Sequence, residues 1–255
     1  MNYIDLNSDI GESYGLYKIG NDKEVLKHIS SANIACGYHA GDHNVMMETV
    51  KMANTNKVKI GAHPGLPDLL GFGRREMNIS PKEIYHLTLY QIGALAAITQ
   101  AHGTHLVHVK PHGALYNMAA SSRPIAEAIA QAVADYNPSL ILFGLSGSEL
   151  IRAGKEKGLL TASEVFADRT YQPDGTLTAR NDENAMIHDV KFAATRIIRM
   201  VKEGKVTATD GTDIDITADT VCVHGDEPAA LEFIKELKAA LTKENIKIRR
   251  RWSGR

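Results

Sequence analysis

The sequence is poor in cysteine, in net charge and in long apolar runs. It has only two cysteines among 255 residues, Cys36 and Cys222, and each lies in an apolar stretch. Two thiols do not make a disulfide framework, so we expect a reducing compartment and cysteines that pack as small apolar side chains. The net charge is -1 and the isoelectric point is near 6.8, which excludes a strongly basic surface and predicts no nucleic-acid or membrane-surface partner.

Signals for export and for membrane insertion are missing as well. The initial stretch MNYIDLNSDIGE carries acidic side chains where a signal peptide would have a basic start and an apolar core. The longest apolar runs, such as SLILFGL, are far too short to cross a bilayer. The sequence therefore predicts a cytoplasmic protein.

Two nucleotide-binding signatures are also absent. The nearest string to a phosphate-binding loop, GSELIRAGKEKG, has the wrong spacing and has Glu156 where a hydroxyl belongs. The string GFGRRE lacks the third glycine of a dinucleotide fingerprint and does not lie between a strand and a helix. The residues alone therefore predict no known nucleotide-binding fold.

What the chain does have is an alternation of short apolar runs with longer amphipathic ones. Short runs without internal alternation are typical of strands buried on both faces of a parallel sheet. We expect strands at 3–7, 33–36, 58–62, 106–109, 140–144, 164–167 and 220–223, and an eighth at 246–249. Repeated βα units without a linker predict a single α/β domain, a (β/α) barrel over residues 1–255.

The helices carry clear start signals. Ser80, Pro81 and Glu83 form a capping-box pattern before a helix that ends at Gly103, and Asp42 can cap a helix through Asn56. Further helices are expected over 146–158, 182–204 and 226 to about 244, and a hairpin is expected around the turn at 210–211.

Polar residues follow nearly every predicted strand. In VKPHGALYN, a strand runs directly into Lys110, Pro111, His112 and Gly113. The other strand ends carry Asn7, Asp9 and Glu12, then His39 and Asp42, His63, Arg74, Asp168 and Arg169, and His224 and Asp226. Because the carboxyl ends of parallel strands form one mouth of a barrel, we expect a site there, with Pro111 and Gly113 shaping the turn that presents Lys110 and His112.

Some of these residues have a second interpretation. Asp42 and Asp226 can act simply as helix N-caps. His39 and His43 are four residues apart, a spacing that can chelate a metal on a helix, and with Asp9 they are similar to the arrangement of metal-dependent carbohydrate deacetylases. If Asp42 begins the helix, however, His39 stays in the preceding loop.

Eight blocks of sequence, in order, resemble the LamB/YcsF family nearly from end to end: DLNSDIGE, ANIACGYHAGD, GAHPGLPD, FGR, HVKPHGALYN, GSELIRAGK, EVFADRTY and VCVHGD. That family is known as the A component of the prokaryotic 5-oxoprolinase, with a seven-stranded (β/α) barrel similar to glycoside hydrolases and deacetylases. The resemblance implies opening of the lactam 5-oxoproline (pyroglutamate) to L-glutamate, coupled to hydrolysis of ATP to ADP and phosphate. It also implies two companion subunits, B and C.

The family motifs also imply roles for single residues. Catalytic roles are implied for Asp9, Glu12, His39, His63, Lys110 and His112. Binding of substrate or phosphate is implied for Asn7, Asp42, Arg74, Asp168, Arg169, His224 and Asp226. His43 lies outside the motif, which weakens a chelate with His39.

The chemistry that the resemblance implies suits these residue types. An unstrained lactam resists water, because amide resonance must be lost. Coupling to ATP suggests phosphorylation of the carbonyl oxygen, with Lys110 and Arg74 on the phosphoryl oxygens and Mg²⁺ held by Asp9 or Glu12. His112, His39 or His63 could then act as the base that delivers water near neutral pH. The residues do not decide which of them does so, or which component of the complex binds ATP.

Two other functions stay open at this point. The first is a stand-alone metal-dependent amidase or deacetylase, which the HAGDH motif favours. The second is a non-catalytic subunit that only holds the lactam while a partner performs the chemistry. Because Asp42 competes as a helix cap, we expect no tightly bound structural zinc, and a divalent ion, if one is needed, should arrive with ATP.

Overall fold

Parallel strands close into a barrel in this computed structural model, which describes residues 2–223 and 230–248. The ring consists of β1 (Asn2–Ile10), β2 (Ser31–Ala35), β3 (Lys59–His63), β4 (Leu106–Val109), β5 (Ile141–Leu145), β6 (Leu160–Phe166) and β9 (Thr220–Cys222). β9 pairs back onto β1 and closes the ring, and β10 (Ile246–Ile248) adds to the first residues of β1. The expected seven-stranded (β/α) barrel is confirmed. That residues 1–255 form one domain stays a prediction.

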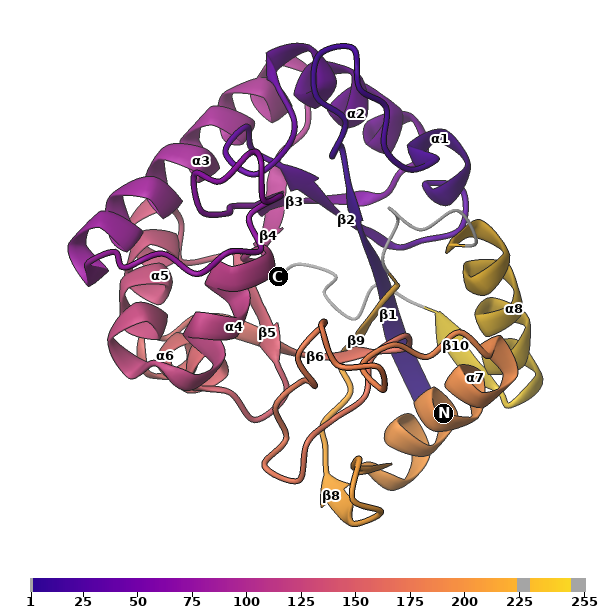
Figure 1. Ribbon diagram of the computed structural model, residues 1–255. Coiled ribbons are helices and arrows are strands. Elements are labelled where there is room, and N and C mark those ends of the chain that lie inside the picture. Colours follow the sequence, from indigo (N-terminus) through magenta and orange to yellow (C-terminus); the bar gives the residue numbers. More distant parts are fainter. Residues whose placement is uncertain (1, 224–229, 249–255) are drawn as a thin grey trace.

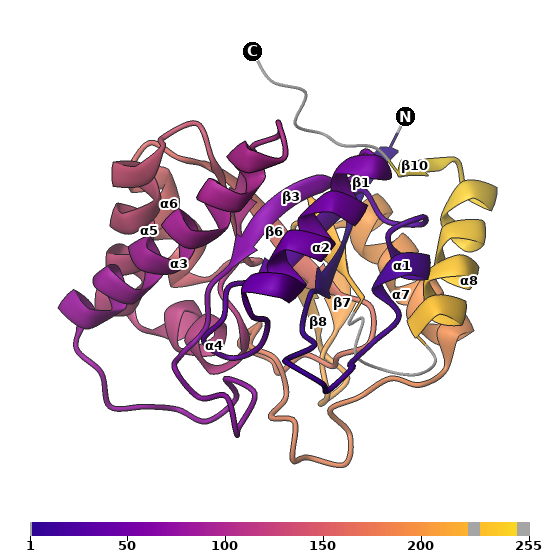
Figure 2. The same ribbon diagram turned by 90° about the horizontal axis from the view of Figure 1, so that it is seen from above.

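Helices surround the barrel, and the long loops that follow its strands gather at one end (Figures 1 and 2). The helices are α1 (Asp22–Val25), α2 (His43–Thr55), α3 (Pro81–Ala101), α4 (Gly113–Ser121), α5 (Arg123–Tyr136), α6 (Glu149–Glu156), α7 (Val190–Glu203) and α8 (Ala230–Lys243). Within the part of the chain that the structure describes, none of them is both long and apolar enough to cross a membrane.

Several local predictions are confirmed. Ser80 caps α3, and its hydroxyl accepts from the Glu83 amide in a complete capping box. Asp42 caps α2 by accepting from the amides of Asn44 and Val45. The predicted hairpin is formed by β7 (Lys205–Thr207) and β8 (Asp213–Asp215), which pair antiparallel.

The predicted helix over 182–204 begins too early. Asp182 accepts from the Asn184 amide and stabilises only a turn, whereas Asp189 accepts from the amides of Lys191 and Phe192 and caps α7. Both aspartates carry the same capping chemistry, and only the second precedes an apolar stripe. Residues 167–189 instead form a long loop after β6. The start predicted at Asp226 lies outside the described residues.

Polar side chains fill much of the barrel interior. Asp5, Asn7 and Asp9 alternate along β1 and therefore point to the same face. Asp5 accepts from the hydroxyls of Ser30 and Thr220, each at 2.7 Å, and burial raises the pKa of Asp5 above its ordinary value in spite of these bonds. A buried polar network of this kind is stable only when its members are hydrogen-bonded.

His108 belongs to the same interior. Its Nε2 lies 2.8 Å from Asn33 Oδ1, and its ring stacks on Phe143 at 4.3 Å between centroids. A Cβ at position 61 would lie 2.1 Å from that Nε2, so Gly61 leaves the space that the ring occupies. Burial, with the charge of Lys110, lowers the pKa of His108 to about 3.

Stability should therefore depend on pH through His108. Below about pH 6.5 this imidazole binds a proton in the unfolded chain but not in the folded chain. The free energy of unfolding therefore decreases as the pH is lowered, by at most about 1.4 kcal/mol per pH unit. We expect His108→Gln to lessen this slope in urea unfolding between about pH 6.5 and pH 5. His86→Gln, on the exposed face of α3, is the matched control. Identical slopes for His108→Gln and the unmodified chain would contradict the prediction.

Candidate active site

Six predicted catalytic residues meet at the carboxyl ends of four neighbouring strands. Asp9 lies near the end of β1 and Glu12 follows it, His39 follows β2, His63 ends β3, and Lys110 and His112 follow β4. Every one of these side chains is buried, with no residue more than 7% exposed. The barrel mouth thus brings together the set that the strand ends predict.

The turn after β4 explains the sequence PHG. The His112 amide donates to the Pro64 carbonyl at 2.8 Å, and the Ala114 amide donates to the Gly73 carbonyl at 2.9 Å. Gly113 has φ +52°, and a Cβ there would lie 2.6 Å from the Gly73 carbonyl oxygen. A glycine is therefore needed for the loops after β3 and β4 to approach each other.

Lys110 lies at the centre of a buried charge network. Its Nζ is 3.0 Å from Asp9 Oδ1, 2.9 Å from Glu164 Oε1 and 3.1 Å from Cys222 Sγ. Burial alone would lower the pKa of Lys110, but Asp9 and the other acidic partners raise it well above its ordinary value. The ammonium group is therefore charged and held in place by two carboxylates.

This network gives one cysteine a polar contact and adds one residue. Cys222 packs in the hydrophobic core as the sequence predicts, and its sulfur also contacts Lys110. Burial raises the pKa of Cys222 well above its ordinary value, so it is a neutral thiol. Sequence reasoning missed Glu164, which is fully buried on β6. A single acidic residue inside the apolar run SEVF was the available signal.

Three histidines, His39, His63 and His112, pack against one another next to Lys110. His39 stacks on His112 with 3.7 Å between ring centroids and 4° between planes, and His63 meets His112 edge-on. His63 Nε2 lies 3.3 Å from Asp9 Oδ2, and His39 Nε2 lies 3.2 Å from Glu12 Oε1. Burial, together with the neighbouring histidines, lowers the pKa of both His39 and His112 well below its ordinary value.

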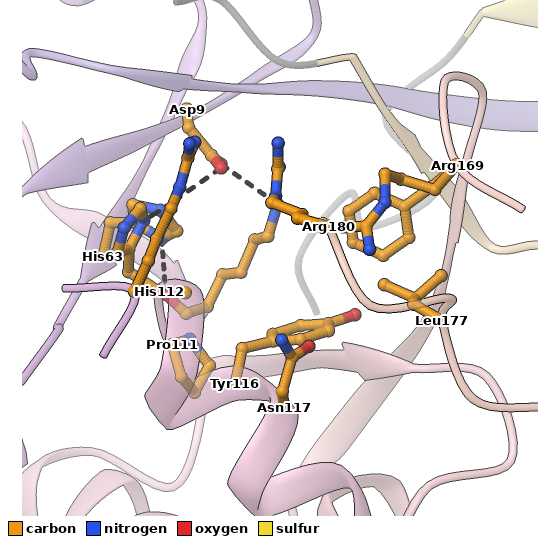
Figure 3. A pocket seen from close by; sticks show the side chains of 13 residues that line it. Asp9, His63, Pro111, His112, Tyr116, Asn117, Arg169, Leu177 and Arg180 are labelled. Carbon is orange, nitrogen blue, oxygen red and sulfur yellow. Dashed lines mark hydrogen bonds and ion pairs between the residues drawn. The ribbon is translucent and has the colours of Figure 1, made fainter. Parts of the chain in front are cut away.

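Three arginines line a pocket together with several of these residues. Arg74, Arg169 and Arg180 line it together with Asp9, His63, Lys110 and His112. Figure 3 shows Arg169 and Leu177 across the pocket from Asp9, His63 and His112. Burial and the nearby Arg180 lower the pKa of Arg169 to about 10, which still leaves it charged at neutral pH. These cations suit an anionic ligand.

The other residues that were predicted to bind substrate or phosphate do not all lie at this pocket. Asn7 lies in the interior network, where its Nδ2 donates to Glu164 Oε1 at 2.9 Å. Asp168 is buried beside Arg169 after β6. Asp42 is a helix cap that also accepts from the Gly15 amide, so it does not join the cluster. His43 is exposed at the start of α2, and His39 groups with Glu12, His63 and His112 instead. His224 and Asp226 lie outside the described residues.

Arg180 is a second residue that sequence reasoning missed. It lies in the long loop over 167–189, which has no periodic pattern and no motif, so nothing in the sequence marked it. The loop brings it to the pocket because backbone bridges such as Arg169 with Met186 and Tyr171 with Leu177 fold the segment back on itself.

Residues 4–253 match the family model of the LamB/YcsF family. The chain belongs to the LamB/YcsF family. One family relative is the 5-oxoprolinase A subunit of Oceanobacillus iheyensis, 65% identical over 248 residues, which are 97% of this chain and 96% of that protein. Another is the 5-oxoprolinase A subunit of Bacillus subtilis, 57% identical over 96% of this chain and 95% of that protein.

A solved structure agrees with the LamB/YcsF assignment. The lactam utilization protein of Thermus thermophilus superposes with a TM-score of 0.91 at 45% sequence identity, covering 97% of this chain and 99% of that one. The barrel described above is therefore also the fold of that protein, whose crystal structure is known.

Proposed function

We propose that this chain is the A subunit of a 5-oxoprolinase and opens 5-oxoproline to L-glutamate in an ATP-dependent complex. The observation that carries the proposal is the convergence of Asp9, His63, Lys110 and His112 on one pocket, in a chain 65% identical to a protein named as a 5-oxoprolinase A subunit. We place the reaction in the cytoplasm, because both cysteines are free thiols and the reaction needs ATP.

The arginines suit the anionic parts of the substrate. 5-Oxoproline carries one carboxylate, and a carbonyl oxygen activated by ATP would carry a phosphoryl group. Arg74, Arg169 and Arg180 line the pocket, and guanidinium groups bind both anions in a bidentate manner. We assign these contacts to the arginines rather than to Lys110, because two carboxylates already hold its ammonium group.

The inner histidines suit the attack by water. The Nδ1 of His63 donates to the Lys110 carbonyl at 2.7 Å, which leaves its Nε2 as the basic nitrogen on the pocket side. The Nε2 of His112 donates to the Phe72 carbonyl at 2.8 Å, which leaves its Nδ1 basic. We propose that one of these two nitrogens takes the proton of the attacking water, and that Asp9, whose Oδ2 lies 3.3 Å from His63 Nε2, stabilises the imidazolium that forms on His63.

ATP and Mg²⁺ belong to the complex in this proposal. A magnesium ion would accompany the phosphates, and one or two carboxylates of the complex would complete its coordination. Because the sequence has no phosphate-binding loop, we propose that the companion subunits B and C complete the nucleotide contacts and close the pocket.

We therefore expect the purified chain alone not to open 5-oxoproline at a useful rate. Phosphoryl transfer depends on positioning and on charge stabilisation, and a pocket open to water provides both poorly. The measurement is glutamate release with ATP, Mg²⁺ and 5-oxoproline, with and without subunits B and C. Robust turnover by the chain alone, undiminished at high dilution, would contradict the prediction. No turnover with both subunits present would contradict the function itself.

A further inference from the structure

His63 and His112 contact each other through one ring nitrogen each. If both rings are neutral, no hydrogen bond can form between these two nitrogens. A backbone carbonyl oxygen can only accept, so each ring must direct an N–H to its own carbonyl, His63 Nδ1 to Lys110 and His112 Nε2 to Phe72. The remaining nitrogens, His63 Nε2 and His112 Nδ1, are 2.9 Å apart. In neutral rings both carry lone pairs, which repel at this distance. A proton or a cation must lie between them.

Glu12 completes a set of ligand atoms around this point. Its Oε1 lies 3.5 Å from His112 Nδ1. One ligand atom from each of Glu12, His39, His63 and His112 lies within 4.8 Å of all the others, and all four residues are buried. Ligands at about 2.0–2.1 Å from a tetrahedral metal are roughly 3.4 Å from one another, and the separations of 2.9 and 3.5 Å lie on either side of that value.

His39 has a different position from the other two histidines. Its ring is parallel to that of His112, at 4° and 3.7 Å, so the in-plane lone pairs of the two rings cannot converge on one ion. Its Nε2 instead lies 3.2 Å from Glu12 Oε1, close enough to donate a hydrogen bond. His39 is thus a positioning residue that orients the carboxylate.

We propose that Glu12, His63 and His112 bind one divalent transition-metal ion and leave one coordination position open to the pocket. Two imidazole nitrogens and one carboxylate suit zinc and its neighbours, whereas Mg²⁺ prefers oxygen ligands. Metal-bound histidines typically donate their second N–H to a carbonyl or a carboxylate, as both rings do here. The alternative is a proton shared between the two rings, which the test below distinguishes from a metal ion. The site goes beyond the proposed function, since it requires neither lactam nor ATP. It replaces the role proposed above for His63 Nε2 and His112 Nδ1 as bases, because a nitrogen that binds a metal ion cannot also accept a proton.

The test uses the whole chain after treatment with EDTA. Calorimetric titration with Zn²⁺ should give one ion per chain, and Co²⁺ should give visible d–d absorption bands of a site with nitrogen and oxygen ligands. We expect His63→Ala and His112→Ala to lower zinc affinity by about 100-fold or more, and His39→Ala by about 10–100-fold. His43→Ala removes an exposed histidine and should leave the affinity unchanged.

Circular dichroism establishes that each variant is folded, and Glu12→Gln provides a ligand change of equal size if an alanine variant does not fold. Folded protein that binds no zinc at micromolar concentration would overturn the proposal. So would zinc binding that His63→Ala, His112→Ala and Glu12→Gln all leave unchanged. A ¹⁵N NMR signal of a proton shared by His63 and His112, in protein that binds no metal, would assign a proton to this place instead.

Discussion

Lys110→Met should lower the stability of the protein and abolish ring opening in the complex. Its removal leaves Asp9 and Glu164 buried side by side without the ammonium group that lies 3.0 and 2.9 Å from them. Breaking a buried ion pair in this way costs about 3–5 kcal/mol of the free energy of unfolding. Activity should fall by about 100-fold or more, because Asp9 would no longer be fixed beside His63. Urea unfolding and glutamate release measure the two effects separately.

A second substitution distinguishes charge from packing. Lys110→Met with Glu164→Gln removes one of the two buried carboxylates that the ammonium group contacted, so part of the lost stability should return while activity stays low. Lys82→Met, on the exposed first turn of α3, is the matched control and should change neither property. A Lys110→Met variant as stable as the unmodified chain would show that the network does not need its cation.

His112→Ala should reduce kcat/KM for 5-oxoproline by about 100-fold or more in the complex with subunits B and C. The imidazole lines the pocket, contacts His63 at 2.9 Å and stacks on His39 at 3.7 Å, so its loss removes a basic nitrogen and also loosens two neighbours. The Phe72 carbonyl loses its partner as well, which should cost about 1–3 kcal/mol of stability.

The control for this variant is His86→Ala. The His86 side chain is exposed on α3 and does not line the pocket. It should keep full activity. Turnover of His112→Ala within about threefold of the unmodified chain would exclude His112 as base or metal ligand, since loss of either role has a much larger effect.

The sequence predicted the barrel and the inner residues of the site for a physical reason. The strands of a parallel barrel are mostly short and rich in apolar residues, and polar residues at or just after their carboxyl ends lie at one end of the barrel. That rule placed Asp9, His63, Lys110 and His112 correctly. It could not supply their mutual geometry, because the stacking of His39 on His112 depends on the tight approach of Gly73, whose Cβ would lie 2.6 Å from His39 Cβ.

Residues outside the rule were missed or misplaced. Glu164 lies within β6 rather than after it, so a search of strand ends passed over it. Arg180 reaches the pocket from a loop that has no periodicity. Asp42 lies after a strand, as the rule requires, but its carboxylate accepts hydrogen bonds from backbone amides at the start of α2. A helix cap and a ligand have the same residue type and position in the sequence, and only the fold distinguishes them.

Closure of the barrel through β1 and β9 has a consequence for biosynthesis. Asn7 donates to Thr220, a partner 213 residues further along the chain. At a translation rate of about 5–20 residues per second, β1 leaves the ribosome roughly 10–40 s before β9 is made. An apolar strand exposed for so long would invite aggregation. The alternating polar residues Asp5, Asn7 and Asp9, which later line the barrel interior, keep the nascent β1 hydrated until its partner arrives.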